Sequence, residues 1–297
     1  MLKFIKRTFA KTKSISQADK SLADGSGVVI HADSNSFPSK PIQLIAASAL
    51  DTGKRRENNE DALLSITSTL AADSENVVFG LYAVADGMGG HKSGELASES
   101  ALRAFADHVI KVLYLPQFRK KATISSPSLQ DIMEDAIKAA HQGVKRAAPG
   151  GGCTLTAALI IGEQMVIAHL GDSRAYILQN GNEITPLTRD HSLVQLLEEQ
   201  GQITHAEAAI HPQKSILYRA LGQGEMAEPE VFSQKFPHGG FLLLCTDGLW
   251  GVISEKEIQE LVYSTQNLHL ASHRLVEAAN AAGGPDNIAA LLIRMAA

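Results

Sequence analysis

Five aspartates stand at the ends of apolar segments, where a carboxylate could take part in chemistry. Asp86 and Asp247 each follow a strongly apolar run and precede a glycine. Asp61 and Asp286 each stand at the start of such a run, and Asp172 follows MVIAHL after one glycine. A carboxylate at the end of a buried strand is costly unless it is paired or binds a metal ion. A surface turn explains one such aspartate equally well, but it explains the full set poorly.

The segments that must position these aspartates alternate between strands and helices. Apolar runs rich in β-branched residues predict strands at 77–85, 154–162, 165–173, 240–248 and 283–295. Two amphipathic helices follow the first strand, and their apolar faces carry Leu102, Phe105, Val109 and Val112 in one and Leu129, Ile132, Ala136, Ala140 and Val144 in the other. Later helices are expected to begin at Ser254 and to span about 272–282.

Short connections between the strands indicate antiparallel sheets. Asn180–Gly181 is a hairpin signal, and the 154–162 and 165–173 runs are joined by a short turn. The helices are expected to cover the outer faces of these sheets, which makes the fold class α+β. In an antiparallel sheet the end of one strand lies beside the start of its neighbour. We therefore expect the five aspartates to converge on one edge.

The overall composition argues against several function classes. The 297 residues carry a formal net charge of −5 and no long basic block, which argues against nucleic acid as the main partner. The longest apolar runs fall far short of the ~20 residues that cross a bilayer, so no stable membrane insertion is expected.

The two cysteines do not fit covalent phosphate chemistry. A cysteine-dependent phosphatase needs an arginine six positions after its nucleophile, but Leu159 and Gly251 stand there after Cys153 and Cys245. Two cysteines in a chain of this size indicate buried thiols in a reducing compartment. We therefore expect a cytoplasmic protein.

Residues 1–41 are expected to form a flexible leader before a catalytic domain at 42–297. The leader is polar and lacks the apolar core and cleavage site of a signal peptide. Its first thirteen residues, MLKFIKRTFAKTK, could form a basic helix that lies on a membrane. A frayed polar tail is the commoner outcome for such a segment.

Eight motifs occur in the order found in metal-dependent serine/threonine protein phosphatases, the PPM or type-2C family, which the chain resembles from about Leu44 onward. They are RRENNEDA, YAVADGMGGHKSGELAS, GCTLTAALI, AHLGDSRAYIL, LTRDHSL, LYRALG, LCTDGLWGVIS and GGPDNIAALLI. The form ADGMGGH is similar to the bacterial branch. The resemblance implies an α-β-β-α sandwich of two antiparallel sheets flanked by helices, with a two-metal centre at one end. It also implies phosphorylated protein substrates, those of a serine/threonine kinase, for an enzyme we expect to be monomeric.

The resemblance further implies roles for individual residues. Arg56, four positions before Glu60, matches the arginine that binds phosphate. Asp86 matches the carboxylate that bridges both metal ions, and Gly87 matches the residue that contributes its backbone carbonyl. Glu60 is expected to flank the site.

The remaining acids match the outer ligands of the centre. Asp247 and Asp286 match ligands of one ion, and Asp61 is expected to bind directly or through water. Asn287 is expected beside the ligands. Asp172 matches the acid that, with Asp247, can hold a weaker third ion in bacterial relatives.

Such a ligand set selects the metal and the reaction. Carboxylates, a carbonyl and waters are hard oxygen ligands, which favour Mg²⁺ or Mn²⁺. Two such ions about 3.5–4 Å apart would acidify a water and orient it for in-line attack on phosphorus. The glycines around Asp86 would let the backbone at Gly87 approach a cation. Arg56 would hold the phosphate oxygens with its planar guanidinium.

The sequence leaves the general acid open. Many eukaryotic members have a histidine where this chain has Met88, and the nearest histidine is His91. His91 is favoured as a structural residue, and a water of the metal centre is the other candidate acid.

Two other functions are compatible with the pattern. A binding module that had lost its ions would show broken ligand positions, whereas all of them are intact here. A small-molecule phosphatase would share the metal centre and differ only in its substrate. The insertion at about 192–223 is expected to form a movable flap that selects the substrate.

Overall fold

The structure is a computed structural model of the 297-residue chain. It describes residues 42–72, 75–89, 92–118, 127–179 and 183–296. The expected leader at 1–41, the Asn180–Gly181 turn and His91 lie outside these residues.

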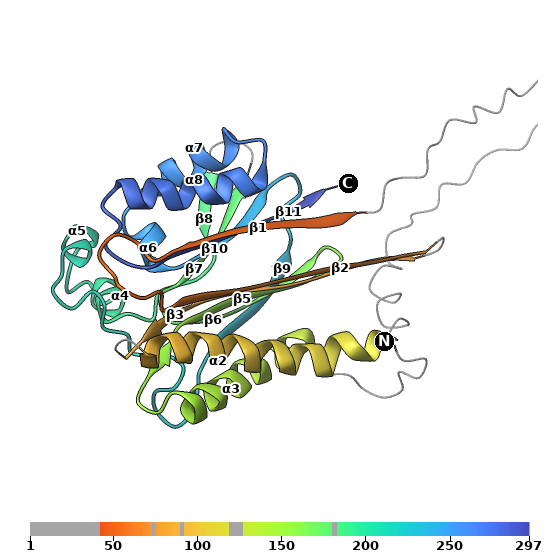
Figure 1. The fold of residues 1–297 in the computed structure, drawn as a ribbon, viewed down its shortest axis with the longest axis horizontal. Coiled ribbons are helices and arrows are strands. Elements are labelled where there is room, and N and C mark those ends of the chain that lie inside the picture. Colours follow the sequence, from red (N-terminus) through yellow and green to blue (C-terminus); the bar gives the residue numbers. More distant parts are fainter. Residues whose placement is uncertain (1–41, 73–74, 90–91, 119–126, 180–182, 297) are drawn as a thin grey trace, which may run out of the picture.

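Two antiparallel sheets form the centre of the molecule (Figure 1). In the first sheet the strand order is β1 (Gln43–Asp51), β11 (Ile288–Ala296), β10 (Phe241–Cys245), β7 (Arg174–Gln179) and β8 (Glu183–Pro186). In the second it is β2 (Asp61–Ala72), β3 (Glu75–Met88), β5 (Leu155–Ile161), β6 (Gln164–Leu170) and β9 (Glu230–Lys235), and β4 (Gly152–Cys153) pairs with β3.

Helices cover the outer face of each sheet, which gives the expected four layers (Figure 1). α2 (Lys92–Val109) and α3 (Leu129–Ala147) lie against the second sheet, and α7 (Glu255–Tyr263) and α8 (Leu268–Ala281) lie against the first. The short helix α6 (Asp247–Trp250) follows β10, and α4 (Leu193–Glu199) and α5 (His205–Ala209) belong to the insertion. The α+β sandwich expected from the sequence is confirmed.

Side chains of β3 alternate between two apolar cores. Leu81 and Ala83 pack with residues of α2 and α3, whereas Tyr82 and Val84 pack with residues of the first sheet. Because both faces of β3 are buried, its sequence is a continuous apolar run. A third core fills the space between the first sheet and the pair α7 and α8.

Two local expectations need correction. Val112 was assigned to the apolar face of the first helix, but it is 38% exposed. The α-helix ends at Val109 and a π-helical turn (Ile110–Tyr114) follows, which rotates the buried position to Leu113. The helix expected at 272–282 begins earlier, at Leu268, because Asn267 accepts a hydrogen bond from Leu270 N and caps it.

Strand β9 was not expected from the sequence. It lies at the edge of the second sheet and its side chains are mostly half-buried, so it has no continuous apolar run.

Among the described residues, no helix combines the length and apolar character needed to cross a bilayer.

Candidate metal centre

Two aspartates of the second sheet lie directly opposite each other. The antiparallel register of β2 and β3 pairs Asp61 with Asp86. Opposed side chains in such a pair have Cβ atoms about 4.5–5.5 Å apart and point to the same face. Asp86 continues the series Tyr82–Val84, whose side chains face the first sheet. Both carboxylates therefore point into the end of the sandwich, between the sheets.

The first sheet places Asp247 and Asp286 at the same end. β10 pairs antiparallel with β11, so the end of one lies beside the start of the other. Asp247 is the first residue of α6, two positions after the end of β10, and Asp286 stands two positions before β11. The backbone at Gly248 lies so close to the Asn287 carbonyl oxygen that any side chain at position 248 would collide with it. The two loops are therefore packed together.

Hydrogen bonds tie the two sheets together beneath these carboxylates. The Thr246 hydroxyl donates to Asp61 Oδ2 at 2.7 Å and accepts from the backbone N–H of Ala289 at 2.9 Å. The Asn287 side chain accepts from Glu60 N at 2.8 Å and donates to the Asn58 carbonyl at 2.9 Å. Asn287 thus fixes the loop that leads into Asp61, beside the acids as expected.

Asp172 lies in the turn that carries the chain from β6 in the second sheet to β7 in the first. The indole N–H of Trp250, at the end of α6, donates to the Asp172 carbonyl at 3.1 Å. The Arg174 guanidinium lies 3.5 Å above the Trp250 ring and donates two hydrogen bonds to Asp190, at 2.9 and 2.8 Å. The helix that begins with Asp247 therefore holds the Asp172 turn in place.

The five carboxylates form one electrostatic group, which we call the acidic cluster: Asp61, Asp86, Asp172, Asp247 and Asp286. Burial raises the pKa of Asp86 well above its ordinary value, and the charges of the other four raise it further. Burial also raises the pKa of Asp61, although the Thr246 hydrogen bond opposes this.

Burial and neighbouring charges also raise the pKa values of Asp247 in α6 and Asp172 in the β6–β7 turn. Burial and then the charge of Asp286 raise the pKa of Asp247 to about 6. Burial, followed by the charges of Asp247 and Asp190, raises the pKa of Asp172 well above its ordinary value. The cluster is therefore short of positive charge, which a divalent cation would supply.

Unpartnered oxygens show where a cation would fit. Asp61 Oδ1 and Asp247 Oδ1 are buried and have no hydrogen-bond partner among the described residues. Buried carboxylate oxygens without donors are costly, and they are the hard ligands that Mg²⁺ and Mn²⁺ prefer. Within the described ranges, no three acidic, histidine or cysteine side chains already surround one point as a finished ligand set. The fit rests on the orphaned oxygens and the mutual repulsion of the acids.

The glycine after Asp86 has a packing role that the sequence did not reveal. A Cβ at Gly87 would collide with the backbone carbonyl of Gly94 and lie 2.7 Å from that of Glu60. Gly94, in α2, in turn lies against the Glu60 side chain. These glycines therefore let α2 and the Glu60 loop close around the end of β3.

Arg56 is paired with a member of the cluster. Its guanidinium donates to Asp286 Oδ2 at 2.7 Å, and its side chain is 53% exposed. The hydrogen bond to Asp286 raises the pKa of Arg56. Arg56 therefore lies at the exposed rim of the cluster.

The insertion at 192–223 is closed by one β-bridge within it and joined to the second sheet by another. Ser192 forms a β-bridge with Leu217, and Leu221 forms one with Cys153 in β4, the strand that pairs with Gly87. Between these anchors several large apolar side chains are exposed, namely Ile210 (84%), Ile216 (46%) and Tyr218 (42%). The insertion thus presents apolar surface from a segment that is bonded to β4, the strand that pairs with Gly87.

Sequence reasoning missed residues that orient the cluster. Thr246 and Trp250 belong to the recognised LCTDGLWGVIS segment but carried no predicted role. Thr154 accepts a hydrogen bond from the Asp86 backbone N–H at 2.9 Å, and its hydroxyl lies 2.7 Å from that of Ser173. Thr154 and Thr246 are polar residues beside apolar runs, and this was the sequence signal that could have identified them.

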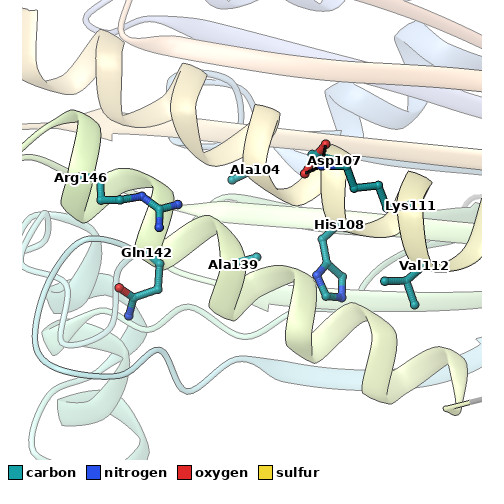
Figure 2. Close-up of a pocket in the computed structure, with 8 residues that line it drawn as sticks. All are labelled: Ala104, Asp107, His108, Lys111, Val112, Ala139, Gln142 and Arg146. Carbon is teal, nitrogen blue, oxygen red and sulfur yellow. Dashed lines mark hydrogen bonds and ion pairs between the residues drawn. The ribbon is translucent and has the colours of Figure 1, made fainter.

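A groove of about 320 Å³ lies elsewhere, between α2 and α3 (Figure 2). Its lining includes Arg146, His108 and Lys111, and Lys111 is paired with Asp107 at 2.8 Å. None of its lining residues belongs to the acidic cluster. The groove is therefore separate from the candidate metal centre.

Comparisons with known proteins agree with this architecture. The family model described as Protein phosphatase 2C matches residues 47–288. The serine/threonine phosphatase stp of Listeria monocytogenes is 37% identical over 243 residues, which cover 82% of this chain and 92% of that protein. PstP of Mycobacterium tuberculosis is 34% identical over 248 residues, or 82% of this chain and 43% of that protein.

Solved structures show the same fold. The catalytic domain of PstP in complex with two manganese ions superposes with a TM-score of 0.68 at 32% identity, covering 86% of this chain and 100% of that one. The S. agalactiae serine/threonine phosphatase gives a TM-score of 0.70 at 30% identity, covering 84% and 98%.

Proposed function

This chain belongs to the protein phosphatase 2C family of metal-dependent serine/threonine phosphatases, and we propose that the acidic cluster is its catalytic centre. The observation that carries the proposal is the convergence of five carboxylates from both sheets, two of them with buried oxygens that lack a partner in the described structure. We further propose that residues 42–297 form the catalytic domain.

We assign the metal ligands as follows. Asp86 would hold two Mn²⁺ or Mg²⁺ ions together with the carbonyl of Gly87, because it is buried and lies opposite Asp61, and the charges of all four other members act on it. Asp247 and Asp286 would complete one ion, and Asp61 would bind directly or through water. Asp172 and Asp247 would hold a weaker third ion. When bound, the ions supply positive charge and acidify the attacking water.

The chain's own groups orient this centre and the substrate. Thr246 fixes the Asp61 carboxylate, and Asn287 fixes the loop before it. Asp286 links Arg56 to the acidic cluster, because this member of the cluster accepts a hydrogen bond from the Arg56 guanidinium. The exposed Arg56 guanidinium would donate a forked pair of hydrogen bonds to phosphate oxygens at this rim.

The insertion and the two thiols support the finer assignments. Exposed Ile210, Ile216 and Tyr218 suit contact with a protein chain around the phosphorylated residue. We therefore propose that the insertion selects phosphoproteins made by a serine/threonine kinase, and that the enzyme acts as a monomer. Cys153 and Cys245 are both buried free thiols, which suits the cytoplasm.

The test compares an aryl phosphate with a phosphothreonine peptide. Protein stripped with a chelator should hydrolyse neither, and Mn²⁺ or Mg²⁺ should restore both activities. Calorimetric titration of the stripped protein should show at least two bound Mn²⁺ ions, and fewer in Asp86→Asn. Full activity in excess chelator, or unchanged Mn²⁺ binding by Asp86→Asn, would refute the assignment. Hydrolysis of the aryl phosphate alone would point to a small-molecule substrate.

A further inference from the structure

His191 is fully buried where the insertion leaves the body of the protein. It follows Asp190 and precedes Ser192, which forms the β-bridge that closes the insertion. The mechanism above assigns it no role. A buried histidine needs partners for both ring nitrogens, because an unpaired buried polar atom is costly.

One partner of His191 is the turn that carries Asp172. The backbone N–H of Gly171 donates to His191 Nδ1 at 3.0 Å, and the backbone N–H of His191 donates to the Gly171 carbonyl at 2.7 Å. Gly171 has φ +115°, and a Cβ there would lie 2.6 Å from Thr154. The turn is therefore held in a conformation that only glycine adopts, with its N–H directed at the histidine ring.

The other partners of His191 lie in the insertion and in β9. The backbone N–H of Tyr218 donates to the His191 carbonyl at 2.9 Å, and the Tyr218 ring meets the His191 ring edge-on at 5.6 Å. His191 Nε2 lies 3.2 Å from Glu230 Oε1. The ring also stacks on buried His169, with centroids 4.8 Å apart. One residue thus joins three segments.

The hydrogen-bond pattern defines the form of the ring. Because Nδ1 accepts from Gly171, a neutral ring carries its proton on Nε2 and donates it to Glu230. A substituted side chain that replaces only Nδ1 or only Nε2 can therefore keep the contact with Gly171 or the contact with Glu230, but not both. Asparagine places an oxygen near the position of Nδ1, and glutamine places its amide near that of Nε2.

We infer that His191 is a positioning residue, which fixes the Gly171–Asp172 turn and couples it to the insertion. Movement of the insertion at Tyr218 is transmitted to Gly171 through the backbone and the ring of His191. A substrate that orders the insertion would therefore also order the Asp172 carboxylate. The catalytic consequence rests on the role proposed above for Asp172, but the coupling itself does not.

The coupling can be measured without any metal ion. Hydrogen exchange of the chelator-treated protein is compared for the wild type, His191→Asn, His191→Gln and His191→Leu. The Gly171 amide should exchange about tenfold faster in His191→Leu and His191→Gln, the equivalent of one lost hydrogen bond. The rate should be near that of the wild type in His191→Asn. The Tyr218 amide should exchange faster in His191→Leu as well.

His141→Leu is the matched control, because His141 is also buried and its Nδ1 accepts from Gly222 N at 3.2 Å, at the other end of the insertion. It should leave Gly171 exchange unchanged. With Mn²⁺ and an aryl phosphate, His191→Gln should lower kcat about tenfold and leave KM unchanged, since Arg56 is not disturbed. His191→Asn should restore kcat.

The results distinguish a positioning role for His191 from a purely structural one. Equal Gly171 exchange in all variants, or equal exchange in His191→Asn and His191→Gln, would overturn the inference. If His191→Leu does not fold, the asparagine and glutamine variants alone decide. Should Asp172→Ala keep full turnover, the third-ion role would fail while the exchange result still stood.

Discussion

The electrostatics of the acidic cluster make a strong prediction for Asp247 in the metal-free protein. Its pKa is raised from 3.8 to about 6, by burial first and then by the charge of Asp286. The folded protein therefore holds this proton more tightly than the unfolded chain does. The stabilising contribution is complete below pH 3.8 and is lost as the pH rises through about 6. Because the pKa of Asp247 rises from 3.8 to about 6 on folding, roughly 3 kcal/mol of unfolding free energy is lost at pH 7.5.

Asp247→Asn removes this charge while keeping the shape of the side chain. In excess chelator at pH 7.5 the variant should be more stable than the wild type by at most about 3 kcal/mol, or roughly 6–12 °C in Tm. The difference should become small near pH 4, where the folded wild-type carboxyl is protonated, and should vanish only below about pH 3, where the carboxyl is protonated in both states. With saturating Mn²⁺ the order should reverse, because the wild type gains binding free energy that the variant lacks.

The assay is urea unfolding followed by the fluorescence of Trp250, the only tryptophan in the sequence. Curves at pH 4, 5.5 and 7.5, with chelator or with Mn²⁺, give the required differences. Asp107→Asn is a control, since Asp107 is exposed on α2 and pairs with Lys111 in the π-helical turn that follows. Its effect should not depend on chelator. A metal-free Asp247→Asn protein no more stable than the wild type at pH 7.5 would refute the argument.

The other predictions concern catalysis. Asp86→Asn should lose at least 90% of turnover while remaining folded by circular dichroism. The reason is that both central ions are proposed to bind the Asp86 carboxylate. Arg56→Ala should lower kcat/KM about tenfold or more without weakening Mn²⁺ binding in calorimetry, since the guanidinium competes for Asp286. Asp172→Ala should keep two tight Mn²⁺ ions and lose most turnover, and unchanged kcat with unchanged stoichiometry would make it a turn residue. Ile216→Ser should reduce turnover of a phosphoprotein several-fold more than that of an aryl phosphate, and equal losses would assign the insertion to the fold.

The apolar runs predicted the central strands and the placement of the aspartates because those signals are local. β3 is buried on both faces, so its run of apolar residues could be identified without knowing its neighbours. Asp61 and Asp86 were expected to meet because antiparallel strands exchange ends, and the register pairs them directly. The edge strand β9 gave no such signal, since its half-buried side chains alternate only weakly.

By itself, the sequence determined which carboxylates stand at the ends of the apolar strands. Only the tertiary structure decided how the two sheets share them. Asp172 reaches Asp247 because the β6–β7 turn crosses between the sheets and Trp250 holds it there. Gly87 is a glycine because α2 packs against it, and His191 joins a distant insertion to Gly171. These contacts join separate elements and loops, so they depend on how the chain packs and leave no periodic trace in the residues themselves.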